Sequence, residues 1–182
     1  MMHHMPSTIA MTYSDYFSGK WSDASLDTYQ FSGWNLIDKV NSLNPDRVLD
    51  IGCGFNRFKG KINNLVGIDP YNDCADCKCS VEEYDGPPAD VVLCLGSINF
   101  GDEETIDHQL EIVDSLFTKY AFFRVNPGIA HSWSADWKDI IWFKWTVEKI
   151  HQVSKKYKYN LTTLEEEKTL QGDQRYYFEF SK

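Results

Sequence analysis

The chain has 182 residues and a formal net charge of −9, with 42% hydrophobic and 25% charged residues. That length fits one hydrophobic core of ordinary size, and the composition is typical of a globular protein rather than a disordered one. The acidic excess disfavours an extended nucleic-acid partner, because phosphate binding needs clustered lysine and arginine. No apolar run approaches the roughly 20 residues of a membrane-spanning helix. Residues 1–11 also lack the pattern of a secretory signal, so we expect a cytoplasmic protein without membrane contact.

The first part of the chain predicts an arm, a helix and two strands. Residues 1–25 show no clear period and are expected to form an N-terminal arm, followed by a single domain over residues 26–182. Apolar residues recur at helical spacing within residues 26–43. Short apolar runs at residues 47–51 and 65–68 predict buried strands, and each ends in a turn sequence.

The second part of the chain continues the alternation of strands and helices. A strand is predicted at residues 89–95, and another at residues 120–125. Between them, apolar residues at i, i+4, i+7 and i+11 mark an amphipathic helix over residues 106–117. A long helix is expected at about residues 135–157. The chain then ends in two extended segments, residues 160–170 and 175–180, joined by a hairpin turn at Gly172 and Asp173.

This order of elements predicts an α/β fold. Strands that alternate with helices favour an open, mostly parallel sheet, and the closing hairpin adds antiparallel strands. The links around a short strand at residues 78–81 are too brief to contain helices. We therefore expect this half of the sheet to lack crossover helices. The N-terminal arm, or the second subunit of a homodimer, would cover this bare surface of the sheet.

The glycine turn after the first strand is the feature that carries chemistry. Gly52 and Gly54 allow a backbone turn to approach a ligand closely. Asp69 ends the next strand, where a carboxylate can accept hydrogen bonds from both hydroxyls of a ribose. Arg57 stands where a nicotinamide-binding fingerprint needs its third glycine, and Asp50 precedes the first glycine, so a nucleotide-dependent oxidoreductase is disfavoured.

The Asp-x-Gly-x-Gly pattern that begins at Asp50, followed by the strand-terminal Asp69, resembles the class I S-adenosylmethionine-dependent methyltransferases. The resemblance extends over about residues 36–180. It implies a Rossmann-like, mostly parallel, seven-stranded sheet with an antiparallel C-terminal hairpin strand, and S-adenosyl-L-methionine as cofactor. Residues 52–61, 67–72 and 124–128 also look like small methyltransferases encoded by bacterial viruses, which would place the protein in a host cytoplasm.

The resemblance also implies a set of cofactor contacts. The glycine turn would lie beneath the methionine part of the cofactor, and the acid after the second strand would hold the ribose. A stretch after the third strand would reach the adenine, with serine where the family usually has aspartate. The end of the fourth strand would lie close to the methyl group. The implied residues are Asp50, Gly52, Cys53, Gly54, Asp69, Pro70, Ser80, Val81, Leu95, Gly96 and Ser97.

Methyl transfer is an in-line displacement that depends chiefly on proximity and orientation. A base, where the acceptor needs one, should lie near the carboxyl ends of the strands. His131 is our first candidate for a base or a substrate contact, the alternative being a solvated histidine before a helix. Asn99 and Asp102 are candidates to orient the acceptor, and Asn126 is a further one.

The acceptor is expected to be a small molecule or a protein. Enzymes that methylate amino groups of DNA carry Asp/Asn-Pro-Pro-Tyr/Phe where residues 95–99 read Leu-Gly-Ser-Ile-Asn, and the Pro-Cys pair of cytosine C5 enzymes is absent. Cys94, inside an apolar strand, is expected to be a buried, inert thiol. The alternative to an enzyme is a non-catalytic module that binds S-adenosylmethionine and acts as a partner or scaffold.

Two further sequence features have competing interpretations. Cys74, Cys77 and Cys79 could supply three zinc ligands. However, the second Cys-x-x-Cys pair of a zinc ribbon is missing, so we expect reduced thiols and no metal. The odd cysteine count also indicates a reducing compartment. Trp137 and Trp145 share a face of the expected long helix with Ile141, which predicts that these side chains pack in the core. Trp142 would point elsewhere. The alternative is that the tryptophans form an aromatic wall for a planar substrate or a dimer contact.

Overall fold

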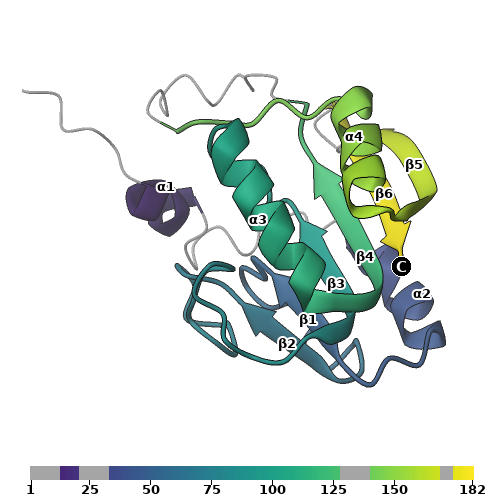
Figure 1. Cartoon of the computed structure of the whole chain (residues 1–182). Helices are drawn as coiled ribbons and strands as arrows, with labels where there is room; N and C mark the ends of the chain where they lie inside the picture. Colours follow the sequence, from purple (N-terminus) through teal and green to yellow (C-terminus); the bar gives the residue numbers. More distant parts are fainter. Residues whose placement is uncertain (1–12, 21–32, 128–139, 169–173) are drawn as a thin grey trace, which may run out of the picture.

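The structure is a computed structural model that describes residues 13–20, 33–127, 140–168 and 174–182 (Figure 1). A sheet with strand order β2-β1-β3-β4-β6-β5 forms its centre. The strands are β1 Val48–Ile51, β2 Leu65–Ile68, β3 Ala89–Leu95, β4 Phe117–Val125, β5 Asn160–Lys168 and β6 Gln174–Ser181. The helices are α1 Tyr13–Lys20, the 3-10 turn η2 Trp34–Leu36, α2 Ile37–Ser42, α3 Glu103–Leu116 and α4 Val147–Tyr157.

The sheet confirms the predicted mixture of parallel and antiparallel strands. Strands β1 to β4 pair in parallel, and β6 runs antiparallel between β4 and β5. The described residues contain six strands, so the prediction of seven was wrong. β1 and β3 are buried on both faces, which explains why both read as continuous apolar runs.

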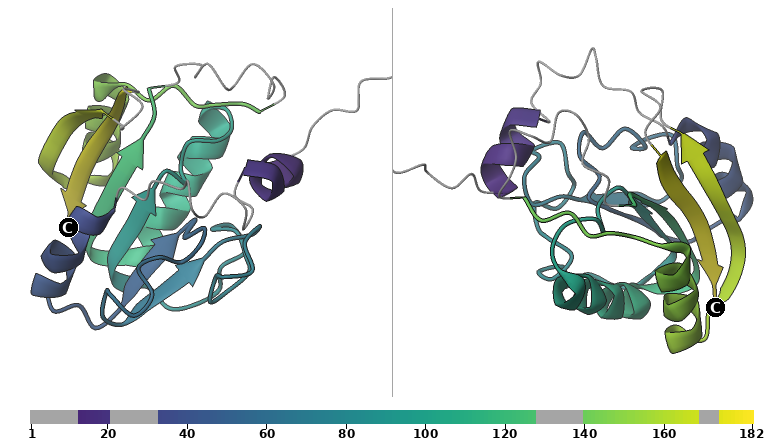
Figure 2. Two further views of the ribbon diagram at one scale, coloured as in Figure 1. Left: turned by 180° about the vertical axis from the view of Figure 1, so that it is seen from behind. Right: turned by 90° about the horizontal axis from the view of Figure 1, so that it is seen from above.

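Two apolar layers enclose the sheet. Helices α3 and α4 cover one face, where their apolar side chains pack on the inward residues of β3, β4 and β6 (Figures 1 and 2). Leu36 and Val40, from η2 and α2, pack on the other face. Phe58 and Ile62 from the loop between β1 and β2 complete that second layer.

The half of the sheet around β1 and β2 lacks crossover helices, as predicted. Residues 52–64 and 69–88 are described throughout and contain no helix. Turns replace the first crossover helix, and Phe58 is only 1% exposed because it fills the space against the sheet that a helix would fill. Because these crossovers contain no helix, only loops surround the carboxyl ends of β1 and β2.

The strand predicted at residues 78–81 does not form, and this prediction was wrong. A single parallel bridge instead joins Ile68 to Cys77 at the outer edge of β2. Asp76 supports the bridge, because its backbone N–H donates to the Gly67 carbonyl at 2.9 Å and its carboxylate accepts from the Gly67 N–H at 2.8 Å. Residues 78–81 contain a single buried side chain, so they have no apolar face that a full strand would bury.

The long helix predicted at residues 135–157 was also wrong in its extent. Residues 140–146 are not helical, α4 begins at Val147, and the residues before 140 lie outside the described part. The Thr146 side chain accepts a hydrogen bond from the Lys149 N–H at 3.0 Å, which makes it the N-cap of α4. The expected turn at residues 172–173 likewise lies outside the described residues.

Trp142 and Trp145, which lie in residues 140–146, are therefore not on a helix. Trp145 is nevertheless 1% exposed, which confirms its predicted core packing, and its Nε1 donates to the Ile98 carbonyl at 2.8 Å. Trp142 is half-buried. Ile141 is 55% exposed, so its predicted core packing was wrong. Trp137 lies outside the described residues. In the part of the chain that the structure describes, no helix is long and apolar enough to cross a bilayer.

Candidate cofactor and methyl-transfer site

The glycine turn after β1 packs directly against the turn after β3. Gly52 has a positive φ of 71°, and a Cβ at this position would lie 2.4 Å from the Cβ of Ser97. The N–H groups of Gly52 and Cys53 both donate to the Ile68 carbonyl, at 2.8 and 3.0 Å. Only glycine combines this backbone conformation with this close approach. The carboxyl ends of β1, β2 and β3 are therefore held together at one place.

Asp69, directly after β2, is fixed by backbone amides. Its Oδ2 accepts from the Gly54 N–H at 3.0 Å. Its Oδ1 accepts from the N–H groups of Tyr71 and Asn72, at 2.8 and 2.9 Å. The carboxylate is half-buried and lies beside the glycine turn, where a residue that binds the ribose of a cofactor would have to lie.

Two further glycines leave backbone uncovered at the same ends of the strands. Gly54 and Gly96 have positive φ values of 52° and 97°, and a Cβ built at either position meets no atom within 4 Å. Open space therefore adjoins the turns after β1 and β3. A ligand can approach the main chain closely at such positions.

Burial controls the protonation of the acidic groups under the turn. Asp50 is 4% exposed, and burial followed by the charge of Asp69 raises its pKa to about 7. Burial, Asp50 and then Asp69 raise the pKa of the Cys53 thiol far above its ordinary value. Cys94 is buried as predicted, and burial raises its thiol pKa as well. Both thiols are neutral at physiological pH and are poor nucleophiles.

The stretch expected to reach an adenine lies beyond the bridge at Cys77. The N–H of Ser80 donates to the Glu83 carboxylate at 2.9 Å, while the Ser80 side chain is half-buried. Val81 is buried against the core that α3 covers, and Pro70 is half-buried after Asp69. These contacts fix the backbone of the stretch.

On the acceptor side, Asn99 joins three segments. It is 1% exposed, and its Nδ2 donates to the Gly96 carbonyl at 3.0 Å while its Oδ1 accepts from the Asn126 N–H at 2.9 Å. The Asn99 carbonyl accepts from the Phe143 N–H at 2.8 Å. The turn after β3, the end of β4 and the segment before α4 are thereby tied together, with half-buried Leu95 at the start of the turn.

Asp102 is the N-cap of α3. Its carboxylate accepts from the backbone N–H and the hydroxyl of Thr105, at 2.9 and 2.7 Å. The first of these hydrogen bonds is the main cause of the lowered pKa of Asp102. His131, the predicted base, lies outside the described residues.

Comparison with known proteins identifies this arrangement of elements. No family model matches the chain, and no curated protein matches it in sequence. The 1,6-didemethyltoxoflavin-N1-methyltransferase of Burkholderia thailandensis, with bound 1,6-didemethyltoxoflavin and S-adenosylhomocysteine, superposes with a TM-score of 0.68 at 13% identity. That match covers 98% of this chain and 92% of the other. The chain has the fold of the class I methyltransferases.

Two further solved structures extend the match to the methyltransferase fold. Magnesium protoporphyrin IX methyltransferase from Synechocystis PCC 6803, with bound S-adenosylhomocysteine, gives a TM-score of 0.64 at 10% identity over 94% of this chain and 87% of the other. A chain from the complex of a methyltransferase activator and a methyltransferase of Haloferax volcanii gives a TM-score of 0.70 at 10% identity. It covers 93% of this chain and 97% of the other. The predicted fold is confirmed apart from its missing strand.

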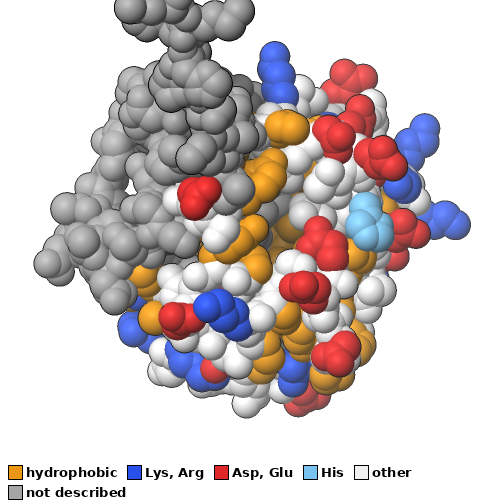
Figure 3. All heavy atoms as spheres, turned by 90° about the vertical axis from the view of Figure 1, so that its left-hand side faces the viewer, with side chains coloured by type: hydrophobic (Ala, Val, Ile, Leu, Met, Phe, Trp, Pro, Cys, Tyr) orange, Lys and Arg blue, Asp and Glu red, His pale blue; other side chains and the backbone are white. Residues whose placement is uncertain are grey.

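A cluster of aromatic side chains at the same edge of the sheet was missed by the sequence reasoning. It joins α1 to the segments that follow β2 and β3 and to the segment before α4. Its members are Tyr13, Tyr16, Phe17, Tyr71, Phe100 and Trp142. The spacing i, i+3, i+4 of the three rings of α1 is a helical signal that could have revealed this helix. On the face drawn in Figure 3, a band of hydrophobic side chains runs between acidic ones.

The predicted cysteine loop has no metal-binding geometry. Cys74 and Cys77 are exposed, Cys79 is half-buried, and all three are free thiols. Within residues 13–20, 33–127, 140–168 and 174–182, no three His, Cys, Asp or Glu side chains are grouped so that they could hold a metal ion.

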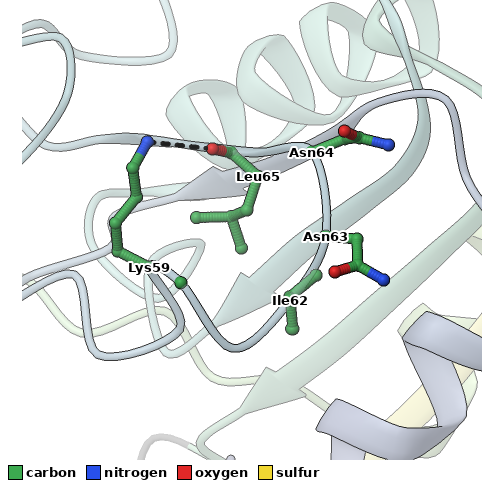
Figure 4. Close-up of a pocket in the computed structure, with 6 residues that line it drawn as sticks. Lys59, Ile62, Asn63, Asn64 and Leu65 are labelled. Atoms are coloured by element: carbon green, nitrogen blue, oxygen red, sulfur yellow. Dashed lines mark hydrogen bonds between the residues drawn. The ribbon is translucent and has the colours of Figure 1, made fainter.

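A surface pocket lies at the opposite end of β2 from Asp69 (Figure 4). It is lined by Lys59, Gly60, Ile62, Asn63, Asn64 and Leu65. The Lys59 ammonium spans it to donate to the Leu65 carbonyl at 3.2 Å, and it also pairs with Asp76 at 2.7 Å. Because Leu65 begins the strand that Asp69 follows, this pocket is separate from the candidate cofactor site.

Proposed function

We propose that the protein is an S-adenosylmethionine-dependent methyltransferase that transfers a methyl group to a small-molecule or protein acceptor. The observation that carries this proposal is the hydrogen bond from Gly54 to Asp69, which places a strand-terminal carboxylate beside a glycine turn within the class I methyltransferase fold. The cofactors and products bound to the solved structures with this fold support S-adenosyl-L-methionine as the ligand.

The residues present fit this cofactor. A carboxylate has about four acceptor positions, and the Asp69 carboxylate uses three for backbone amides, which leaves acceptor capacity for a ribose hydroxyl. The bare backbone at Gly54 and Gly96 leaves room for a ligand. Asp50, Gly52 and Cys53 would lie beneath the methionine part, Pro70, Ser80 and Val81 near the adenosine, and Leu95, Gly96 and Ser97 near the transferred methyl group. When bound, the cofactor supplies a methyl group activated on a sulfonium.

The chain's contribution to the reaction would be orientation. In-line transfer requires the acceptor atom to be held on the axis of the breaking bond, and this alignment accounts for much of the rate. We propose Asn99 as a positioning residue, because its amide is already used to hold the turns after β3 and β4. Asp102 would act in the same way through the first turn of α3. His131, which follows β4 in the chain, stays our candidate for a base or acceptor contact.

The five free cysteines support a reducing compartment, and we propose the cytoplasm. The net charge of −9 favours an acceptor other than a long polyanion. We propose no resident metal.

The test is methyl transfer from labelled S-adenosylmethionine into a cell extract separated into small-molecule and protein fractions. We expect label in one fraction with the wild-type protein and with Asp73→Asn, whose side chain is 89% exposed. Asp69→Asn should transfer little label. If the wild-type protein binds the cofactor but labels neither fraction, the enzyme proposal is wrong and the protein is a non-catalytic binding module.

A further inference from the structure

Helix α1 is in direct contact with the loop that holds Asp69. The rings of Phe17 and Tyr71 are stacked, with centroids 4.9 Å apart and an interplanar angle of 10°. Tyr71 lies two residues after Asp69, and its N–H donates to the Asp69 carboxylate at 2.8 Å. Phe17 of the N-terminal helix therefore contacts a residue that is hydrogen-bonded to Asp69, the residue proposed to bind the ribose.

The same helix has a second anchor on the loop after β3. The rings of Tyr13, Tyr16 and Phe17 lie 6.3, 6.1 and 5.0 Å from that of Phe100. Phe100 follows Asn99 directly and is itself packed on another ring of the segment before α4, at 4.7 Å. Tyr16 is 1% exposed, so this anchor is a small apolar core.

These two anchors lie on either side of the proposed cofactor position. One is in the loop after β2, which carries Asp69, and the other is in the loop after β3, which begins at Gly96. An isolated helix as short as α1, with eight residues, is not stable in water on its own. The position of α1 therefore depends on contacts outside the helix, among them these ring contacts, and Tyr71 is still 38% exposed.

We propose that α1 is a lid over the cofactor site, and that the stack of Phe17 on Tyr71 sets how long the cofactor stays bound. This inference rests on the proposed function, because it assumes that the cofactor lies between the loops after β2 and β3. Release would require Phe17 to leave Tyr71, and the loss of one aromatic contact would speed it.

The experiment measures the dissociation of labelled S-adenosylhomocysteine from the full chain during a chase with unlabelled ligand. Phe17→Leu and Tyr71→Leu each keep an apolar side chain but remove the stack. We expect each to raise the dissociation rate about threefold to tenfold, the factor that one aromatic pair contributes. The double variant should release the ligand no faster than the faster single variant, because both changes remove the same contact.

The control is Trp34→Leu, which removes a ring that is 47% exposed on η2, outside the aromatic cluster. It should leave the dissociation rate unchanged. Thermal unfolding of all four variants checks that the domain stays folded. If Phe17→Leu disturbs the helix itself, Tyr71→Leu still tests the stack, because Tyr71 lies in the loop after β2 and not in α1. Equal release from wild type, Phe17→Leu and Tyr71→Leu would overturn the lid while leaving the proposed function intact. Failure of the wild-type chain to bind the ligand would overturn both.

Discussion

The N–H of Gly54 donates to the carboxylate of Asp69 across 3.0 Å, and this hydrogen bond joins the ends of two neighbouring parallel strands. The same carboxylate also orders the start of the next loop through Tyr71 and Asn72. Asp69 therefore has two functions in our account. It shapes the glycine turn, and it presents an acceptor to a ligand in that turn.

Asp69→Asn should weaken both functions, because the amide nitrogen would face at least one of the backbone N–H groups that now donate to the carboxylate. The amide keeps one oxygen acceptor for the backbone but loses the charge and half of the acceptor positions. We expect the affinity for S-adenosylhomocysteine to fall at least about tenfold, because hydrogen bonds to charged groups contribute about 1.5–3 kcal/mol. Calorimetric titration measures this loss. Asp73→Asn is the control, and an unchanged affinity in Asp69→Asn would remove Asp69 from the site.

Gly52→Ala and Gly54→Ala should behave differently although both glycines have positive φ. A Cβ at Gly52 would collide with Ser97, so we expect a loss of about 2–4 kcal/mol in the free energy of unfolding. A Cβ at Gly54 meets open space, so only the backbone strain of about 1–2 kcal/mol remains.

The same pair tests the ligand position. Gly54→Ala should stay folded yet bind S-adenosylhomocysteine at least about tenfold more weakly, because the added methyl group would occupy space that we assign to the ligand. Denaturant unfolding and calorimetry give the two quantities. Full affinity in Gly54→Ala would place the ligand elsewhere.

Asp50 should make stability depend on pH. Its pKa is about 7 in the folded protein, against 3.8 for an ordinary aspartate. Between these values the folded state binds more protons than the unfolded state, so the contribution of Asp50 to stability falls as pH rises from about 4 to 7, then levels off. Asp50→Asn should remove this decline and be more stable than wild type at pH 8, by up to about 4 kcal/mol.

Unfolding in urea from pH 4 to pH 8 checks the prediction for Asp50. Asp85→Asn, a change of the same kind at an exposed position, should preserve the wild-type dependence on pH. A parallel course for wild type and Asp50→Asn over this range would show that the buried carboxyl does not titrate there.

Trp145→Phe tests the connection between the segment before α4 and the loop after β3. The ring is kept, but the buried hydrogen bond from Nε1 to the Ile98 carbonyl is lost. We expect a loss of about 1–3 kcal/mol, the cost of an unsatisfied buried acceptor. Trp34→Phe, at an exposed ring, should change stability by less than about 0.5 kcal/mol. Equal effects of the two changes would contradict the role of this bond.

The sequence predicts β1, β2 and β3 well because all three strands are almost fully buried. β1, β2 and β3 lie within the parallel part of the sheet, and this burial requires nearly continuous apolar residues that are visible in any window. The glycine turn and Asp69 are visible for a related reason, since a positive φ and a close approach at Gly52 admit only glycine.

The missed features depend on partners far away in the chain. Residues 140–146 contain apolar residues at helical spacing, yet the Gly101 N–H donates to the Ile141 carbonyl at 2.9 Å and Phe143 bonds to Asn99. These hydrogen bonds use the backbone groups that a helix would need. In the same way, the Asp76 carboxylate accepts the hydrogen bond from the Gly67 N–H that a further strand at the outer edge of β2 would accept. A strand-like sequence pattern does not reveal such a side-chain contact.

The glycine turn and the position of Asp69 could be predicted from local sequence, whereas the contacts of Asn99 could not. The buried amide of Asn99 donates to Gly96 and accepts from Asn126, contacts between distant segments that leave no local pattern in the sequence. The aromatic cluster is similar, because Phe17 and Tyr71 meet only once the sheet has formed. Short loops with long-range contacts are where propensity carries least information.

Calorimetric titration of the full chain with S-adenosylhomocysteine, and separately with NAD, decides whether the protein binds the methyltransferase cofactor. We expect one binding site for S-adenosylhomocysteine and no binding of NAD. Binding of NAD without binding of S-adenosylhomocysteine would contradict this expectation.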